Sequence, residues 1–110
     1  MTWERLLDRV EPLHALVAEI GGELVGLTHY LFHRSTTAID PICYLADIFT
    51  RAELRGRGVG RALIEAVYER ALDSGASRVY WQAHETNSTA MLLYDKVAEH
   101  SGFFVYRKLL

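Results

Sequence analysis

Three glycines at alternate positions, Gly56, Gly58 and Gly60, join an apolar segment to an amphipathic one. The apolar segment, residues 41–49 (PICYLADIF), predicts a strand that is buried on both faces. Glycine lets the backbone turn tightly and approach a ligand closely. A strand, a glycine loop and a helix in this order are typical of phosphate sites, because the first helical N–H groups have no helical partner and attract anions. The junction therefore predicts an α/β domain that binds a compact anion.

The segment after the glycines has helical periodicity. Apolar residues recur at i, i+3, i+4, i+7 and i+8, namely Val59, Ala62, Leu63, Ala66, Val67 and Ala71. Gly75 predicts the end of this helix. A strand over residues 77–84 and a second helix within residues 86–102 follow, with Asn87 or Ser88 as the cap and Gly102 after the end. The central strand, helix and strand predict a parallel pair with a right-handed crossover.

The remaining segments complete one predicted domain, residues 1–110. Residues 3–10 have helical spacing and stop at Pro12. Residues 14–33 predict two strands around a two-residue turn, Gly21-Gly22. Residues 103–110 predict a last strand. The expected order is α-β-β-β-α-β-α-β, a mixed α/β (α+β) fold.

Composition narrows the class of protein. Cys43 is the only cysteine, which favours a reducing compartment, and no apolar run approaches the ~20 residues of a membrane span. We therefore expect a soluble, cytoplasmic protein with no membrane partner. The formal net charge is −2, and the basic residues concentrate in one spot around the glycines. Nucleic-acid binders usually carry a basic excess over a whole face, so we expect no nucleic-acid partner.

Three phosphate-binding patterns can be compared at the junction. The P-loop pattern G-x-x-x-x-G-K-[ST] does not occur here. The dinucleotide pattern G-x-G-x-x-G fails because Arg61 stands where the third glycine belongs, which disfavours a dinucleotide-binding unit. The pattern R-x-x-G-x-G does fit residues 55–60.

This pattern, between a strand and a helix, resembles the acetyl-CoA pyrophosphate loop of the GNAT superfamily of N-acetyltransferases. Residues 84–103 (HETNSTAMLLYDKVAEHSGF) resemble the family's second motif, and the likeness covers about residues 14–110. It implies a mixed, splayed β-sheet flanked by helices. It also implies direct acetyl transfer from acetyl-CoA to a primary amine, on a small molecule or a lysine-containing peptide.

The resemblance assigns roles to residues. Tyr94 would be the general acid. Ile48 and Phe49 would pair with the pantetheine arm through their main chains, and Asn87 would contact the cofactor. The pyrophosphate would lie against residues 55–61, namely Arg55, Gly56, Arg57, Gly58, Val59, Gly60 and Arg61. A backbone N–H near Ile48 could stabilise the oxyanion, an interaction worth roughly 3 to 4 kcal/mol.

The general base is left open between Asp47 and Glu85, both placed near the expected thioester site. Each role also has a structural alternative: Tyr94 as a core residue, Asn87 as a helix cap and Asp47 as a hydrogen-bonded structural group. Cys43 reads as a small buried hydrophobic residue.

No metal site is expected. His29 and His33 would share a face of one strand but lie roughly 13 Å apart at ~3.3 Å per residue, too far for a single ion. They would instead line a substrate entrance or lie at the surface.

The chain also departs from the family. We expect it to lack the family's usual first strand and helix, which would expose a sheet edge and favour a homo-oligomer. The second helix is expected to run about one turn longer than usual, with little room for a separate final strand. A second possible function is therefore an acyl-CoA-binding or interaction module without catalysis.

Overall fold

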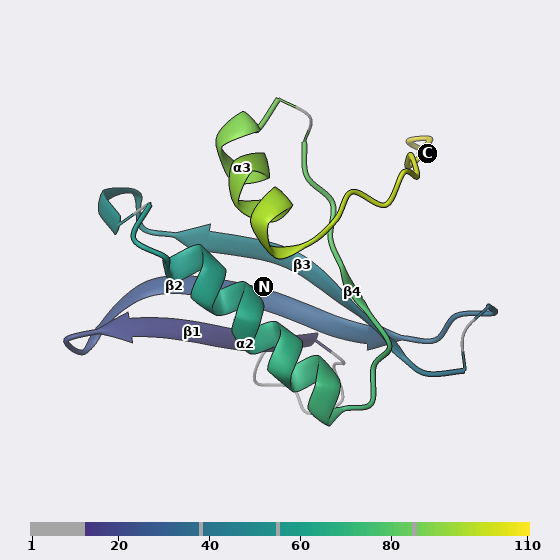
Figure 1. The fold of residues 1–110 in the computed structure, drawn as a ribbon, viewed down its shortest axis with the longest axis horizontal. Helices are drawn as coiled ribbons and strands as arrows, with labels where there is room; N and C mark the ends of the chain where they lie inside the picture. Colours follow the sequence, from purple (N-terminus) through teal and green to yellow (C-terminus); the bar gives the residue numbers. More distant parts are fainter. Residues whose placement is uncertain (1–12, 38, 55, 85) are drawn as a thin grey trace.

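The computed structural model describes residues 13–37, 39–54, 56–84 and 86–110, so the helix predicted within residues 3–10 lies outside the described residues. Four strands form one mixed sheet in the order β1-β2-β3-β4 (Figure 1). They are β1 (Leu13–Ile20), β2 (Glu23–His33), β3 (Ile42–Thr50) and β4 (Val79–Tyr80). The pairs β1/β2 and β2/β3 are antiparallel, and β3/β4 is parallel. The predicted mixed sheet and its central parallel pair are confirmed.

The turn between β1 and β2 is formed by the two predicted glycines. Gly21 and Gly22 have φ values of 60° and 82°. Both lie in the left-handed region, where a side chain would strain the backbone. This local requirement explains why the hairpin could be placed from the sequence.

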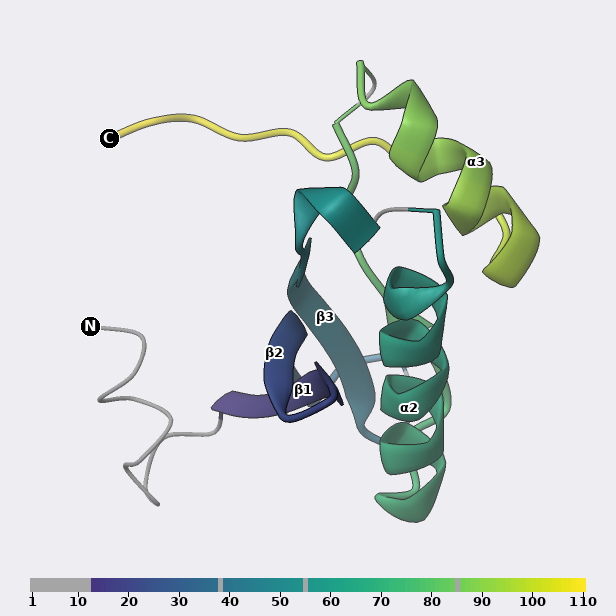
Figure 2. The same ribbon diagram turned by 90° about the vertical axis from the view of Figure 1, so that its left-hand side faces the viewer.

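Helix α2 (Val59–Asp73) packs on one face of the sheet, as Figures 1 and 2 show. Its apolar stripe meets the strands in the main core cluster, which contains Tyr30, Cys43, Leu45, Ile64, Val67 and Ala71. At its first turn the helix comes close to Gly26 of β2. A Cβ placed on Gly26 would lie only 2.8 Å from Val59 Cγ1 and 3.2 Å from the carbonyl oxygen of Phe49. Gly26 therefore permits the close approach that places the start of α2 beside β3.

Helix α3 (Ser88–Val97) follows the strand β4 and begins at its predicted cap. The Asn87 side chain accepts a hydrogen bond from the Ala90 amide, at 3.3 Å. At the other end, the Tyr68 hydroxyl of α2 donates to the Val97 carbonyl, at 2.8 Å. This bond satisfies one of the carbonyl groups that every helix leaves unpaired at its end. Helix α3 is therefore held to α2 by a specific contact.

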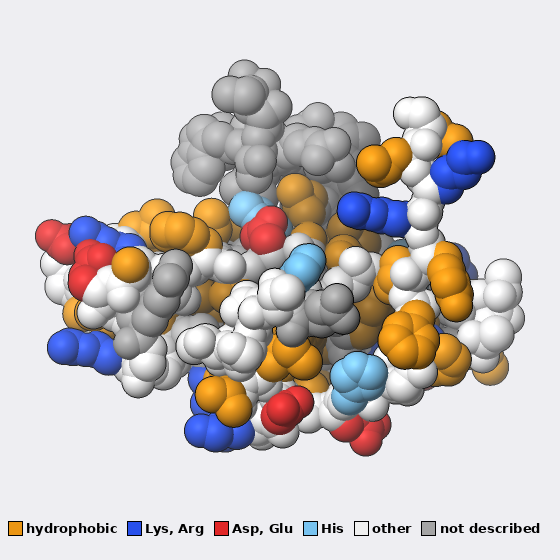
Figure 3. Space-filling model, turned by 90° about the horizontal axis from the view of Figure 1, so that it is seen from above, with side chains coloured by type: hydrophobic (Ala, Val, Ile, Leu, Met, Phe, Trp, Pro, Cys, Tyr) orange, Lys and Arg blue, Asp and Glu red, His pale blue; other side chains and the backbone are white. Residues whose placement is uncertain are grey.

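Several predicted bounds were wrong. Strand β4 has two residues rather than the eight of residues 77–84, and α3 ends at Val97 rather than near residue 102. Residues 103–110 form no strand, although their composition suits one; Phe103, Phe104 and Tyr106 are 85 to 93% exposed. A strand needs a neighbour to pair with, and these residues extend away from the sheet (Figure 2). Hydrophobic side chains gather along this end of the chain in Figure 3.

Strand β3 also differs from its prediction. Ile42, Cys43 and Leu45 are buried, whereas Ala46, Asp47 and Phe49 are exposed. The strand is thus buried at its beginning and open at its end. A short 3-10 helix, η1 (Ala52–Leu54), follows and leads to the glycine junction. Among the described residues, no helix is long and apolar enough to cross a membrane.

Candidate functional site

The open end of β3 arises because β3 and β4 separate. Their pairing consists of Cys43 with Val79 and Tyr44 with Tyr80. Strand β3 then continues to Thr50, while the chain after Tyr80 turns away toward α3 (Figure 1). The edge of β3 beyond Tyr44 therefore has no strand partner on its β4 side within the described part of the chain. This is the splay that the sequence resemblance predicted.

A β-bulge decides which peptide groups face the open edge. Tyr30 pairs with Leu45 and His29 pairs with Asp47, so Ala46 is an extra residue in β3. A bulge of this kind reverses the alternation of peptide groups along the strand. Before the bulge, the Cys43 amide donates toward β4, to the Arg78 carbonyl at 3.0 Å.

Beyond the bulge, a hydrogen bond just after the end of β3 shows which way the peptide groups point. The Arg51 amide donates toward β2, to the Val25 carbonyl at 3.0 Å. Alternation then directs the peptide groups of Phe49 and Asp47 toward β2 and those of Ile48 and Thr50 toward the open edge. Of the two residues predicted to pair with a pantetheine arm, Ile48 thus has its main chain on the open side, and Phe49 does not.

The glycine junction lies directly after this end of β3. Gly56 and Gly58 have φ values of 83° and 84°, and a Cβ on either would meet nothing within 4 Å. Backbone conformation and not crowding within the chain requires glycine here. Gly58 is the N-cap of α2 and supplies no side-chain cap. The described residues provide no backbone acceptor for the amides of Val59, Gly60 and Arg61, as is usual for the first turn of a helix.

The first amide of the loop is used differently. The Arg57 amide donates to the Leu54 carbonyl at 3.3 Å, which closes the turn between η1 and α2. The helix then begins with the bond from the Ala62 amide to the Gly58 carbonyl, at 3.0 Å. The donors available to an anion are therefore those of the first helical turn.

Two arginines of the basic spot predicted around the junction are already in ion pairs. Arg51 contacts Glu23 at 3.2 Å and Glu53 at 2.9 Å, and Arg61 contacts Glu65 at 2.8 Å. Blue and red side chains accordingly lie side by side at this end of the molecule in Figure 3. Such exposed pairs exchange readily with other partners. Arg57 is in no ion pair with another described residue, and Arg55 lies outside the described residues.

Tyr94 lies on α3 and packs against the main core cluster, as does Ile48. Its ring meets Trp81 edge-on, with centroids 5.4 Å apart. Burial raises the pKa of its phenol above the ordinary value, so the hydroxyl keeps its proton at neutral pH. The hydroxyl has no hydrogen-bond partner among the residues that the structure describes. Tyr94 is thus both a packing residue and a protonated donor.

Helix α3 reaches the glycine junction through Leu93, the neighbour of Tyr94. A Cβ on Gly60 would lie 3.4 Å from Leu93 Cδ2 and 3.8 Å from Thr50 Oγ1. Gly60 therefore lies between the end of β3 and α3. Asn87 occupies the cap of α3, and a cofactor contact for it remains a prediction.

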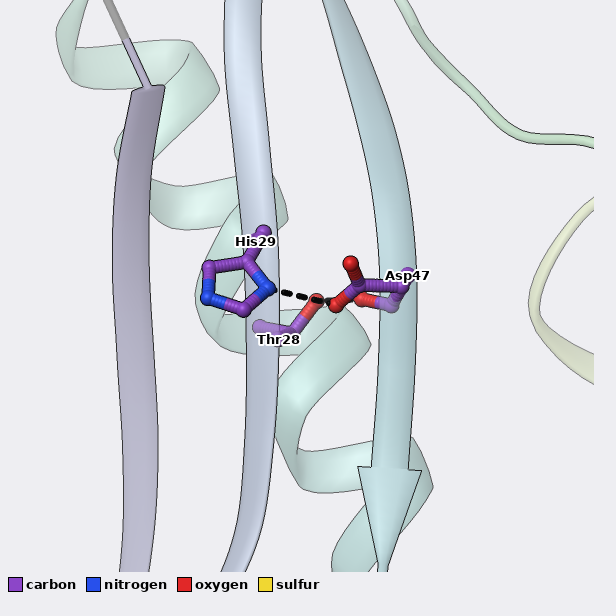
Figure 4. A network of polar contacts seen from close by, with 3 residues as sticks. All are labelled: Thr28, His29 and Asp47. Carbon is purple, nitrogen blue, oxygen red and sulfur yellow. Dashed lines mark hydrogen bonds and ion pairs between the residues drawn. The ribbon is translucent and has the colours of Figure 1, made fainter. Parts of the chain in front are cut away.

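Asp47 forms the most specific polar contact near the splay. Its carboxylate oxygen Oδ1 lies 2.7 Å from Nδ1 of His29, and its carbonyl accepts a 2.6 Å hydrogen bond from the Thr28 hydroxyl (Figure 4). Gly26 faces α2, so alternation places His29 and its partner Asp47 on the opposite face. The Asp47 side chain is 58% exposed, whereas that of His29 is 6% exposed.

One of the two histidines in β2 differs from what the sequence suggested. His29 was expected at a substrate entrance or at the surface, but it is buried. His33 is partly exposed, and its Nε2 lies 2.8 Å from the Tyr80 hydroxyl. Cys43 is fully buried as predicted, and burial raises the pKa of its thiol to about 11.

Sequence reasoning missed Thr28 and His29 as neighbours of Asp47. Period-two alternation places His29 on one face, but its partner across the sheet depends on the bulge at Ala46. A polar residue in each of two adjacent apolar strands was the available sign. Glu85, the other proposed base, lies outside the described residues. Within the described ranges, no group of three or more His, Cys, Asp or Glu side chains could hold a metal ion.

The parts of the site approach the splay from two sides. The start of α2, with its unpaired amides, lies on one face of the sheet, and the Asp47 carboxylate lies on the other. The Ile48 peptide is at the open edge between them. The arrangement can bind an anionic group on the α2 face and a cationic or amine group on the Asp47 face.

Comparison with known proteins agrees with this geometry. The model of the acetyltransferase (GNAT) family matches residues 1–98. The chain is 38% identical over 109 residues to a D-amino-acid N-acetyltransferase of Saccharomyces cerevisiae. This alignment covers 97% of this chain and 68% of that protein. It is 40% identical over 107 residues to a thialysine N-epsilon-acetyltransferase of Bos taurus, covering 86% of this chain and 62% of that protein.

Comparison with solved structures gives the same fold. The crystal structure of a ribosomal-protein-alanine N-acetyltransferase from Brucella melitensis biovar Abortus 2308 superposes with a TM-score of 0.85 at 22% identity. The match covers 97% of this chain and 77% of that chain. Together with the splayed sheet and the glycine junction, these matches show that this chain belongs to the GNAT family of acetyltransferases.

Proposed function

We propose that this chain transfers an acetyl group from acetyl-CoA to a primary amine by direct attack of the amine on the thioester. The observation that carries the proposal is the open end of β3, which has anion-binding amides on one face and a carboxylate on the other. Relatives named for the N-acetylation of D-amino acids and of thialysine favour a small amine of the amino-acid type as acceptor. A lysine side chain in a peptide is the other candidate.

The residues present fit a nucleotide-linked thioester. The amides of Val59, Gly60 and Arg61 would hold the pyrophosphate, and the open space beside Gly56 and Gly58 leaves room for it. The peptide groups of Ile48 and Thr50 would pair with the amide-containing arm as a neighbouring strand does. Arg55, Arg57 and Asn87 would add outer contacts.

Three groups would act on the reacting atoms. Asp47 would accept a proton from the amine, so that its nitrogen can form a bond with the carbonyl carbon. The Ile48 amide would donate to the carbonyl oxygen as negative charge develops there. Tyr94 would give its proton to the sulfur as the carbon–sulfur bond breaks, a step worth roughly 10²–10⁴-fold. Burial raises the pKa of Tyr94, so its hydroxyl is protonated at neutral pH and carries the proton that the sulfur needs.

The test is release of free CoA thiol from acetyl-CoA, measured over a panel of amines, amino acids including thialysine, and a lysine-containing peptide. We expect amine-dependent release by the wild-type chain. Tyr94→Phe should lower kcat about 10²-fold and leave affinity for acetyl-CoA unchanged. Binding of acetyl-CoA without release for any amine would instead support the interaction-module alternative, and no binding would contradict both functions.

A further inference from the structure

We propose that His29 is a positioning residue: its imidazole holds the Asp47 carboxylate in the orientation that receives the amine. This inference rests on the proposed function and assigns a role to a buried side chain that takes no direct part in it. The contact is the 2.7 Å approach of His29 Nδ1 to Asp47 Oδ1.

The chemistry of the pair fixes the proton. An ionised carboxylate can only accept hydrogen bonds, so the proton between the two groups belongs to Nδ1 of His29. The other tautomer would direct a nitrogen lone pair at the carboxylate. His29 therefore donates a hydrogen bond to Asp47. In metal sites and catalytic sites, a hydrogen-bond partner of this kind orients the neighbouring ligand or base.

The burial of the two side chains shows which of them can contact the amine. The imidazole is 6% exposed, and its Nε2 is buried without a partner among the described residues. It cannot exchange protons with a bound amine from that position. The Asp47 side chain is 58% exposed, and its Oδ2 has no partner in the part of the chain that the structure describes. The carboxylate therefore offers one oxygen to the amine while the other is held by His29.

The backbone of Asp47 is held from the same strand. Thr28, which is fully buried, donates its hydroxyl to the Asp47 carbonyl at 2.6 Å. Thr28 and His29 are consecutive, so their side chains leave opposite faces of β2, as Figure 4 shows. One residue secures the main chain beside the bulge, and the other secures the side chain. The Ile48 amide, which would bind the thioester carbonyl oxygen, is the next peptide group along β3. Fixing the main chain and side chain of Asp47 therefore also fixes the distance between the Asp47 carboxylate and that carbonyl.

The energetics of the buried imidazole favour a functional role for His29 over a stabilising one. A buried polar atom without a partner costs stability. Leucine at position 29 would remove both this cost and the bond to an exposed carboxylate, so we expect His29→Leu to fold about as stably as wild type. Its effect should appear in turnover, because a misplacement of about 1 Å can cost roughly 10²-fold in rate.

The experiment compares five variants in the CoA-release assay, the last two being Asp47→Asn and the double variant Asp47→Asn/His29→Leu, with thermal unfolding measured on each. His29→Leu should lower kcat about 10- to 100-fold with little change in the KM for acetyl-CoA. His29→Asn, whose amide can donate from near the Nδ1 position, should recover most of the loss. His33→Leu removes the other histidine on this face of β2 and serves as the matched control, with kcat unchanged. In an Asp47→Asn background, His29→Leu should have no further effect, because it acts through Asp47.

A second measurement does not depend on activity. Nitrogen NMR of the His29 ring should show a proton on Nδ1, and Asp47→Asn should alter that signal. Full turnover by a stably folded His29→Leu variant, or a proton on Nε2 alone, would overturn the inference and leave the proposed function intact. Absence of any acetyl transfer by the wild-type chain would overturn the proposed function and this role with it.

Discussion

The two halves of β3 make one strand but have opposite surroundings. Over Ile42–Leu45 the strand pairs with β2 along one edge and with β4 at Cys43 and Tyr44 along the other, and three of its four side chains are buried. From Asp47 to Thr50 its partner among the described strands is β2 alone, and all four side chains are exposed or partly exposed. The closed half contributes apolar burial, and the open half contributes peptide groups and a carboxylate to a ligand. A single bulged residue, Ala46, separates them.

The comparison teaches that stability and chemistry are divided along one strand. Apolar burial supplies most of the folding free energy, and peptide groups available to a ligand are by definition unpaired in the free protein. Substitutions in the closed half should therefore change unfolding, and substitutions in the open half should change turnover.

The largest expected effect is in the closed half. Leu45 is 3% exposed and belongs to the main core cluster. Leu45→Ala should lower the free energy of unfolding by about 2–5 kcal/mol, because it removes buried surface and leaves a cavity. Urea unfolding gives the loss, and turnover per folded molecule should stay near that of wild type. A stable Leu45→Ala variant would show that the closed half is not a packed core.

The next effect is in the open half. Asp47→Asn should reduce kcat roughly 10²-fold or more, since an amide cannot accept the proton of the amine. Its unfolding free energy should change by less than about 1 kcal/mol, because the side chain is mostly exposed. Kinetics and urea unfolding on the same preparation test both statements. Retained turnover would remove Asp47 as the base.

A smaller effect is expected where the open half leads into α2. Gly58 has a φ of 84°, and an alanine there costs about 1–2 kcal/mol of backbone strain. Gly58→Ala should lower stability by that amount and also weaken acetyl-CoA binding, because the first turn of α2 must shift. Calorimetric titration measures the binding. Gly75→Ala, with a φ of 77° just beyond the end of the same helix, is the matched control that should lose stability alone.

The smallest effect concerns the surface pair on α2. Arg61 and Glu65 are both more than half exposed. Glu65→Gln should change the free energy of unfolding by no more than about 0.5 kcal/mol. If Arg61 then turns toward the pyrophosphate more readily, acetyl-CoA should bind slightly more tightly in a titration at low salt. A large loss of stability would mean that the pair is structural.

The sequence could predict features that depend on residues close together in the chain, and it could not predict those that depend on contacts across the sheet. Gly21-Gly22 and the Asn87 cap depend on neighbouring residues, and both lie where they were predicted. The stripe of α2 was predicted in the main, but Ala62 is exposed and Ile64, which was not assigned to it, is buried. The bulge at Ala46 and the burial of His29 depend on strand register across the sheet, which no local pattern specifies. Residues 103–110 have the composition of a strand but pair with none of the described strands, so the prediction from composition was wrong. The splay was predicted only through the family resemblance.

The central claim is that acetyl-CoA binds along the open edge of β3 with its pyrophosphate at the start of α2. Backbone amide NMR during titration with acetyl-CoA tests it most directly. We expect the largest shifts at the amides of Ile48, Thr50, Val59, Gly60 and Arg61, with little change at Cys43 and Tyr44 in the closed half. Shifts confined instead to the far end of the sheet around His33 and Tyr80, or no shifts at saturating acetyl-CoA, would contradict it.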